Sequence, residues 1–174
     1  MNIRNLISDL LLVITLVLVQ IFLLKNLAVF GVGFGFLYVL GILILPISLR
    51  TIPLMLIAFG MGLIVDVFYE TVGMHTASAT FLAFIRPLWL KAISPTGGYD
   101  ESDEPTLNQM GLRWFVSYGF PLIFVYSLVF FVIDQLGVGN IFMALNKSLF
   151  STIFSMLLAI LVQLLFFKRR RSIR

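Results

Sequence analysis

Long apolar runs dominate this amino-acid sequence and constrain its fold more than any other feature. An α-helix rises 1.5 Å per residue, so about 20 apolar residues cross the roughly 30 Å hydrocarbon core of a membrane. Of the 174 residues, 60% are hydrophobic and 11% are charged, whereas charged residues make up about 25% of soluble domains. The sequence therefore predicts an all-α integral membrane protein, with six transmembrane helices in a single domain. The predicted spans are 6–24, 30–49, 52–69, 74–93, 112–136 and 141–167.

The basic residues predict the orientation of these spans, because Lys and Arg accumulate in the cytoplasmic loops beside transmembrane helices. With six spans, Lys25 and Lys147 fall on one side and the other ten basic residues fall on the opposite side. The asymmetry persists without Arg86, which lies in or at the end of the fourth span. We therefore expect both termini, the polar loop 94–109 and the basic tail 168–174 in the cytoplasm. The tail also attracts anionic lipid headgroups.

Composition and spacing argue against several other classes of protein. The chain has no cysteine, which excludes disulfides and thiol chemistry. Its basic residues flank the apolar runs and form no patch, so no nucleic-acid partner is expected. The glycine-rich stretch 31–36 lacks the spacing of a dinucleotide-binding loop, and we expect a turn or a bent start of the second span there. The first run is longer than the roughly 7 to 15 residues of a signal-peptide core and is predicted to be a retained span.

The acidic linker 94–109 is the one clearly polar connection between predicted spans. It contains two prolines, two glycines and four acidic residues, a composition that favours a loop over a helix. Either a solvated loop or a docking site for a cytoplasmic partner would explain it.

Asp66 is the acidic residue that most needs a structural reason. Counted from the inner end of the third span, it lies about 21 Å along a helix that must cover about 30 Å. Asp9 and Asp134 lie near span ends, where interfacial water solvates them. Steps of four residues along the third span mark one helical stripe that contains a small-xxx-small pair, so we expect Asp66 to face a neighbouring helix. The stripe consists of Ala58, Gly62, Asp66 and Glu70.

After Asp66 the chain turns at Gly73 and returns through a second polar stretch. A hairpin of the third and fourth spans would bring the hydroxyl of Thr76 or Ser78 to Asp66, and His75 near Glu70. The predicted role of this polar cluster is to lock the hairpin. On the returning span, Ala79 and Ala83 repeat the small-xxx-small spacing that lets helices pack closely.

Three sharper interpretations of the same residues remain open. One imidazole and two carboxylates lack a second His motif, which makes a metal site a weak hypothesis. A general acid–base pair has no companion nucleophile in a recognisable setting, so no catalytic residue is predicted. A proton or ion relay is better motivated, since intramembrane carboxylates often mark such paths. No cofactor is expected.

At these residues the chain resembles the bacterial rod shape-determining protein MreD family. Members of that family carry a span ending in Gly-x-x-x-Asp, a short turn and then Gly-x-x-x-Ala. The corresponding residues here are Gly62, Asp66, Gly73 and Ala77. The chain length, the six short-looped spans and the basic tail also fit the family.

The resemblance implies a non-enzymatic scaffold of the cell-wall elongation machinery, which maintains rod shape from the bacterial inner membrane. The implied partners are a bitopic MreC-like protein, the peptidoglycan glycosyltransferase and transpeptidase pair and, indirectly, an MreB-type cytoskeleton. The implied fold is similar to the substrate-binding subunits of energy-coupling-factor vitamin transporters. A transport subunit is therefore the alternative function, although the first span lacks the Ala-x-x-x-Ala motif that those subunits usually carry. The family contributes no catalytic residues, and the acidic linker is longer than in its short members.

Overall fold

The computed structural model describes residues 3–25, 28–29, 33–100, 103–135 and 140–166, with the backbone alone for 3–10 and 28–29. The described chain is mostly helical. Its elements are α1 (Ile3–Val19), the π-helical turn η1 (Gln20–Leu24), β1 (Ala28–Val29), β2 (Gly33–Phe34), α2 (Tyr38–Ile44), α3 (Thr51–Tyr69), α4 (Met74–Ala92), α5 (Leu107–Met110), α6 (Leu112–Asp134) and α7 (Ile141–Phe166).

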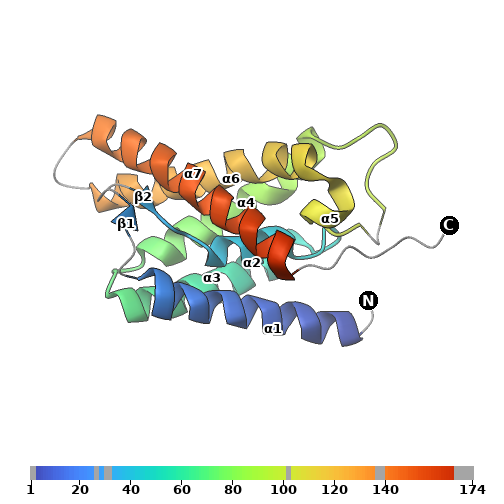
Figure 1. Cartoon of the computed structure of the whole chain (residues 1–174), viewed down its shortest axis with the longest axis horizontal. Coiled ribbons are helices and arrows are strands. Elements are labelled where there is room, and N and C mark those ends of the chain that lie inside the picture. Colours follow the sequence, from blue (N-terminus) through green and yellow to red (C-terminus); the bar gives the residue numbers. More distant parts are fainter. Residues whose placement is uncertain (1–2, 26–27, 30–32, 101–102, 136–139, 167–174) are drawn as a thin grey trace.

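The five long helices run between two ends of the molecule (Figure 1). At one end α1 begins, α7 ends and α5 lies beside the end of α7; at the other end lies the antiparallel β1–β2 hairpin. Helices α3 and α4 form one packed hairpin and α6 and α7 form another, with α4 in contact with α6. The short helix α2 lies inside this frame (Figure 1), where all of its residues except Ile44 are buried.

Three of the described helices, α3, α6 and α7, are long enough and apolar enough to cross a membrane, and a shorter apolar helical segment covers Leu11–Leu24. The outward side chains of these helices are apolar as well. Leu56, Val67 and Leu157 are each more than half exposed. A large exposed apolar surface of this kind marks contact with lipid or with another protein, so these helices indicate a membrane protein.

The predicted second span, 30–49, differs from a full transmembrane helix. Its helix α2 has seven residues, which rise about 10 Å. Ahead of it, Gly33 and Phe34 form the strand β2, and Leu37 already has helical dihedral angles. Of the stretch 31–36, for which a turn or a bent start was predicted, residues 31–32 lie outside the described part. At the other end of α2, Leu45 takes an extended conformation (ψ 148°) directly before Pro46, because the proline ring disfavours a helical preceding residue.

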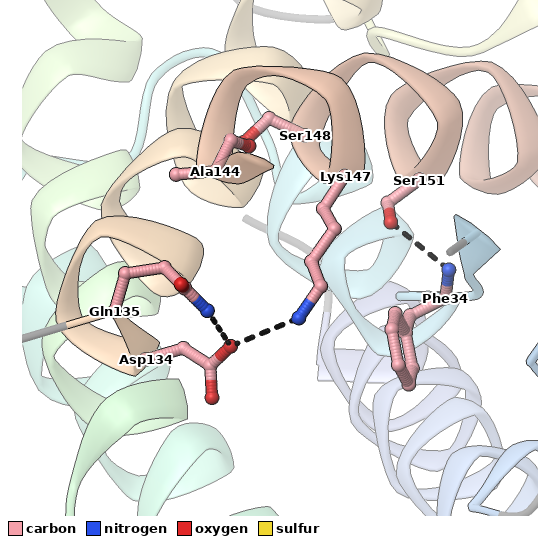
Figure 2. Close-up of polar contacts among 7 residues, drawn as sticks. All are labelled: Phe34, Asp134, Gln135, Ala144, Lys147, Ser148 and Ser151. Carbon is pink, nitrogen blue, oxygen red and sulfur yellow. Dashed lines mark hydrogen bonds and ion pairs between the residues drawn. The ribbon is translucent and has the colours of Figure 1, made fainter. Parts of the chain in front are cut away.

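Side chains from distant helices satisfy the backbone N–H groups ahead of α2. Non-helical backbone is tolerated at membrane depth only where protein or a water-filled cavity surrounds it. Figure 2 shows one of these bonds, in which Phe34 N donates to Ser151 Oγ at 2.9 Å. Phe36 N donates to Ser155 Oγ at 2.8 Å, also on α7. Leu37 N donates to Oε1 of the buried Gln20 at 2.7 Å.

Arg86 of α4 satisfies the carbonyl groups at the other end of α2. This side chain is fully buried, and its Nη2 donates to Leu43 O at 3.2 Å and to Leu45 O. Its Nε donates to the hydroxyl of Tyr118 at 2.6 Å, and that hydroxyl donates in turn to Leu43 O at 2.8 Å. A cation favours the negative end of a helix dipole. Arg86 is therefore a cap for α2 and lies within the bundle.

The predicted loop 94–109 contains most of the short helix α5, and residues 101–102 lie outside the described part. Leu107 N, at the start of α5, donates to Gln163 Oε1 of α7 at 2.8 Å. This bond ties the end of the loop to the bundle. The predicted basic tail 168–174 lies outside the described residues.

Candidate functional site

The turn between α3 and α4 is short and uses two left-handed residues. Glu70 has φ 58° and Gly73 has φ 77°, a conformation that glycine adopts without strain. The N–H groups of Glu70 and Thr71 both donate to Asp66 O. The turn therefore brings the carboxylate of Asp66 to the first residues of α4.

Both oxygens of the Asp66 carboxylate are saturated with donors from the turn and from α4. Thr71 Oγ1 and His75 N donate to Oδ1 at 2.6 and 3.0 Å. Thr76 N and Thr76 Oγ1 donate to Oδ2 at 2.8 and 2.5 Å. Asp66 thereby satisfies N–H groups of the first helical turn, which have no partner within the helix, and places negative charge at the positive end of the α4 dipole.

Gly62 marks the closest approach of the two helices. A Cβ atom at this position would lie 2.6 Å from Thr76 Cα and 2.8 Å from His75 O, both of them backbone atoms. Ala58 on α3 is fully buried, as are Ala79 and Ala83 on α4. Small side chains thus let the backbones of α3 and α4 touch, which shortens the hydrogen bonds that Asp66 accepts.

Of the four residues proposed for the polar cluster, Thr76 alone bonds to Asp66 through its side chain, and the side chains of Ser78, Glu70 and His75 lie elsewhere. Ser78 is buried, but its hydroxyl donates to Met74 O at 2.7 Å within its own helix, because a Ser side chain four residues after a helical carbonyl bonds to it locally. Glu70 caps α3 with an exposed side chain, whereas His75 points into the core. Thr71, which was not singled out from the sequence, bonds to Asp66. The Thr71 hydroxyl lies five residues after Asp66, in the predicted turn, and this spacing could have identified it as a partner of Asp66.

His75 belongs to a separate buried group with two tyrosines. Tyr126 OH lies 2.7 Å from His75 Nδ1 and 2.7 Å from Tyr38 OH, and Tyr38 OH lies 3.4 Å from the same nitrogen. The rings of Phe36, Tyr69 and Phe130 surround the imidazole with centroid distances of 5.9, 5.1 and 4.6 Å. The tyrosines lie 37 and 51 positions from His75, so no local pattern in the sequence could have revealed the group.

The polar residues form no metal centre within the described part of the chain. No group of three His, Asp or Glu side chains lies there that could hold a metal ion. Asp134, at the end of α6, pairs with Lys147 Nζ at 3.4 Å (Figure 2). The side chain of Asp9 lies outside the described residues.

An open apolar groove lies on the exposed side of the α3–α4 hairpin, with a volume of about 550 Å³. Gly73 and Ala77 line it, both exposed, and a Cβ at Gly73 would meet no atom within 4 Å. The motif that begins with Gly62 and Asp66 inside the hairpin thus continues on its outer face. The complete lining is Met55, Phe59, Leu63, Gly73, Thr76, Ala77, Thr80, Phe81 and Phe84.

Comparison of the chain with protein families, with curated proteins and with solved structures found no match.

Proposed function

We propose that this protein is a non-enzymatic scaffold of the bacterial cell-wall elongation machinery, of the MreD type, and that the groove beside α3 and α4 receives the transmembrane helix of a bitopic MreC-like partner. The groove carries the proposal. Helices in a membrane associate where small residues let their backbones approach, because lipid is as apolar as the helix surface. Gly73 and Ala77 offer such a surface on an outward face.

The Asp66 cluster gives this surface a fixed shape. Four hydrogen bonds join Asp66 to the turn and to α4, and Gly62 holds the helices in backbone contact. A preformed surface loses less conformational freedom when a partner binds. The same saturated carboxylate is poorly suited to relay protons, because each oxygen is already held by two donors.

We further propose that the chain crosses the inner membrane six times, with the second crossing interrupted. Extended residues rise about 3.3 Å each, so residues 33–36 add at most about 13 Å to the roughly 10 Å of α2, since Leu37 is already helical. Together they cover about 23 Å of the roughly 30 Å hydrocarbon core. The N–H and carbonyl groups exposed by the interruption are bonded by Gln20, Ser151, Ser155 and Arg86, as a membrane interior requires.

Co-purification from mild detergent tests the scaffold proposal. The tagged protein is expected to recover the MreC-like protein and, through it, the synthase pair. Ala77→Phe should abolish recovery because it fills the groove from an exposed position. Ala92→Phe is the matched control, since Ala92 is also an exposed alanine of α4 but lies outside the groove, and it should leave recovery unchanged.

Cell shape provides the second measurement. Cells depleted of the protein should lose their elongated form and regain it with the wild type or with Ala92→Phe, but not with Ala77→Phe. Equal rescue by the two variants would contradict a role for the groove. Recovery of an ATPase module together with a vitamin, in place of wall-synthesis proteins, would favour the transport subunit.

A further inference from the structure

A second hollow, a cavity of about 220 Å³, lies at the end of the molecule that carries the β1–β2 hairpin. It shares no lining residue with the groove. Aromatic rings form much of its wall, with Phe36 and Phe130 packed at 5.1 Å and Phe130 and Phe131 at 5.2 Å between centroids. Pockets that bind drug-sized ligands have volumes of roughly 300 to 1,000 Å³. This smaller cavity therefore suits a molecule with a single ring.

His75 provides the polar group at the closed end of the cavity. The side chain lines the cavity, is 1% exposed, and its Nε2 has no hydrogen-bond partner within the described chain. Its Nδ1 is bonded to Tyr126, and neither Tyr126 nor Tyr38 lines the cavity. The Nε2 edge of the ring is therefore the edge turned toward the cavity, but the atom itself is buried, so the surrounding side chains must shift for a ligand oxygen to reach it.

The hydrogen-bond distances favour a proton on this edge. Tyr38 OH, Tyr126 OH and His75 Nδ1 are joined by two 2.7 Å contacts whichever group donates, and in one direction Tyr38 donates to Tyr126 and Tyr126 donates to Nδ1. The reverse direction would leave the Tyr38 proton with a 3.5 Å contact to His75 O, which is at the limit of a hydrogen bond. The favoured direction, in which Tyr126 donates to Nδ1, leaves the proton of the imidazole on Nε2. A buried donor without a partner is unfavourable, and an acceptor atom in the cavity would satisfy it.

The mouth of the cavity is lined by charged side chains. Lys147 and Lys25 line it with one carboxylate, that of Asp134. Lys147 Nζ lies 3.4 Å from Asp134 Oδ2, as Figure 2 shows, and 5.6 Å from the centroid of the Phe131 ring. Lys25 Nζ donates to Phe68 O at 2.6 Å. Two cations and one anion leave the mouth with an excess of positive charge.

We propose that this cavity binds a small, flat organic acid. Its ring lies against Phe36, Phe130 and Phe131, an oxygen at one end accepts from His75 Nε2, and a carboxylate at the other end lies beside Lys147. The site would let the scaffold respond to a soluble molecule at that end of the membrane. The proposal rests on different residues from the partner groove and stands or falls separately.

The chain contains one histidine, so labelling with ¹⁵N-histidine reports on His75 alone. In detergent micelles without a probe, the NMR spectrum of the ring should show the proton on Nε2. Addition of 4-hydroxybenzoate at millimolar concentration should shift the Nε2 resonance saturably and move Nδ1 less, because Nδ1 remains bonded to Tyr126. Phenol lacks the carboxylate and benzoate lacks the hydroxyl at the opposite end of the ring, so each should bind more weakly.

Variants separate this site from a nonspecific effect. Lys147→Met removes a partly exposed cation and should weaken 4-hydroxybenzoate binding roughly tenfold, the effect of losing a hydrogen bond to a charged group. Ala92→Phe, at an exposed residue that lines neither the cavity nor the groove, should bind as the wild type does. Gel filtration confirms that each variant is folded and monodisperse. Absence of a saturable shift in the wild type would overturn the proposal. Phenol that binds as tightly as 4-hydroxybenzoate, or Lys147→Met that binds as tightly as the wild type, would overturn it as well.

Discussion

Asp66 holds the hairpin through the number of donors that it accepts, more than through its charge. Thr71, His75 and Thr76 direct four N–H or O–H groups at its two oxygens. An ionised carboxylate has about four lone-pair sites for such bonds. The arrangement explains how a span can contain an acidic residue, whose insertion near the bilayer centre costs at least about 2.5 kcal/mol.

Substitutions at Asp66 should rank by how many of these donors they still satisfy. Asn keeps one acceptor oxygen, and the Thr hydroxyls can turn to accept from its amide, so one backbone N–H is left without a partner, at about 1 to 3 kcal/mol. Leu leaves the N–H groups of both His75 and Thr76 unpaired and should cost about twice as much. Thermal unfolding of the purified protein in detergent measures both. Equal stability of the Asn and Leu variants would show that the carboxylate does not hold the α3–α4 hairpin together.

Gly62 gives a second prediction at the scale of one atom. Gly62→Ala places a methyl group 2.6 Å from Thr76 Cα, and because backbone cannot rotate away, α3 and α4 must separate. Overpacking of this kind costs about 1 to 3 kcal/mol. The control is Gly60→Ala in the same helix, where a Cβ meets nothing within 4 Å and better helix propensity should stabilise by up to about 1 kcal/mol. An equal decrease in the unfolding midpoints of Gly62→Ala and Gly60→Ala would contradict the close contact at Gly62.

At this scale the sequence predicted what depends on helical periodicity. A step of four residues placed Ala58, Gly62 and Asp66 on one face, and Thr76 was one of two hydroxyls offered to Asp66. The periodicity did not decide between Thr76 and Ser78, because that choice depends on the crossing point of the helices at Gly62. The contacts of His75 with Tyr38 and Tyr126 were beyond it, since they join three elements far apart in sequence.

At the scale of elements, α2 is the segment whose helix was predicted least well. Predicted boundaries at 52–69, 112–136 and 141–167 lie within two residues of α3, α6 and α7, because in these runs an apolar sequence of that length forms one helix. The run 30–49 is also mostly apolar but contains a seven-residue helix. Hydropathy cannot distinguish the two cases, since the backbone ahead of and behind α2 is satisfied by remote side chains, among them Gln20 and Arg86.

Arg86 should therefore be more important to stability than to topology. Arg86→Met removes the donors to Leu45 O and Tyr118, while Leu43 O keeps its bond from Tyr118. Leaving buried acceptors unpaired should lower stability by about 1 to 3 kcal/mol. Arg86→Lys keeps the charge but lacks the planar fork that reaches separate acceptors, so it should restore only part of the loss.

The exposed Arg113 provides the matched control for Arg86. Arg113→Met should change the unfolding temperature little, since surface substitutions usually alter stability by less than about 0.5 kcal/mol. If Arg86→Met were as stable as Arg113→Met, the carbonyl groups at the end of α2 would have another source of donors.

At the scale of the whole molecule, the loops are sorted to two ends. The α3–α4 turn lies at the end of the β1–β2 hairpin, and the connection from α4 to α6 lies at the end where α1 begins and α7 ends (Figure 1). The lysines that the charge count assigned to the outside, Lys25 and Lys147, both line the cavity at the hairpin end. The charge asymmetry and the geometry therefore predict together that the hairpin end lies on the outer side of the membrane and the connection from α4 to α6 lies in the cytoplasm.

Single cysteines can test that prediction without background, because the chain has none of its own. Val72 is fully exposed in the α3–α4 turn and Thr96 is exposed in the loop after α4. In intact cells with a permeabilised outer envelope, a membrane-impermeant maleimide should label Val72→Cys and spare Thr96→Cys, and lysis should make both reactive. The reverse pattern would invert the orientation and place the proposed acid-binding cavity in the cytoplasm. Labelling of both before lysis would contradict a membrane between the two ends, whereas the predicted pattern puts the cavity mouth outside and the acidic loop inside.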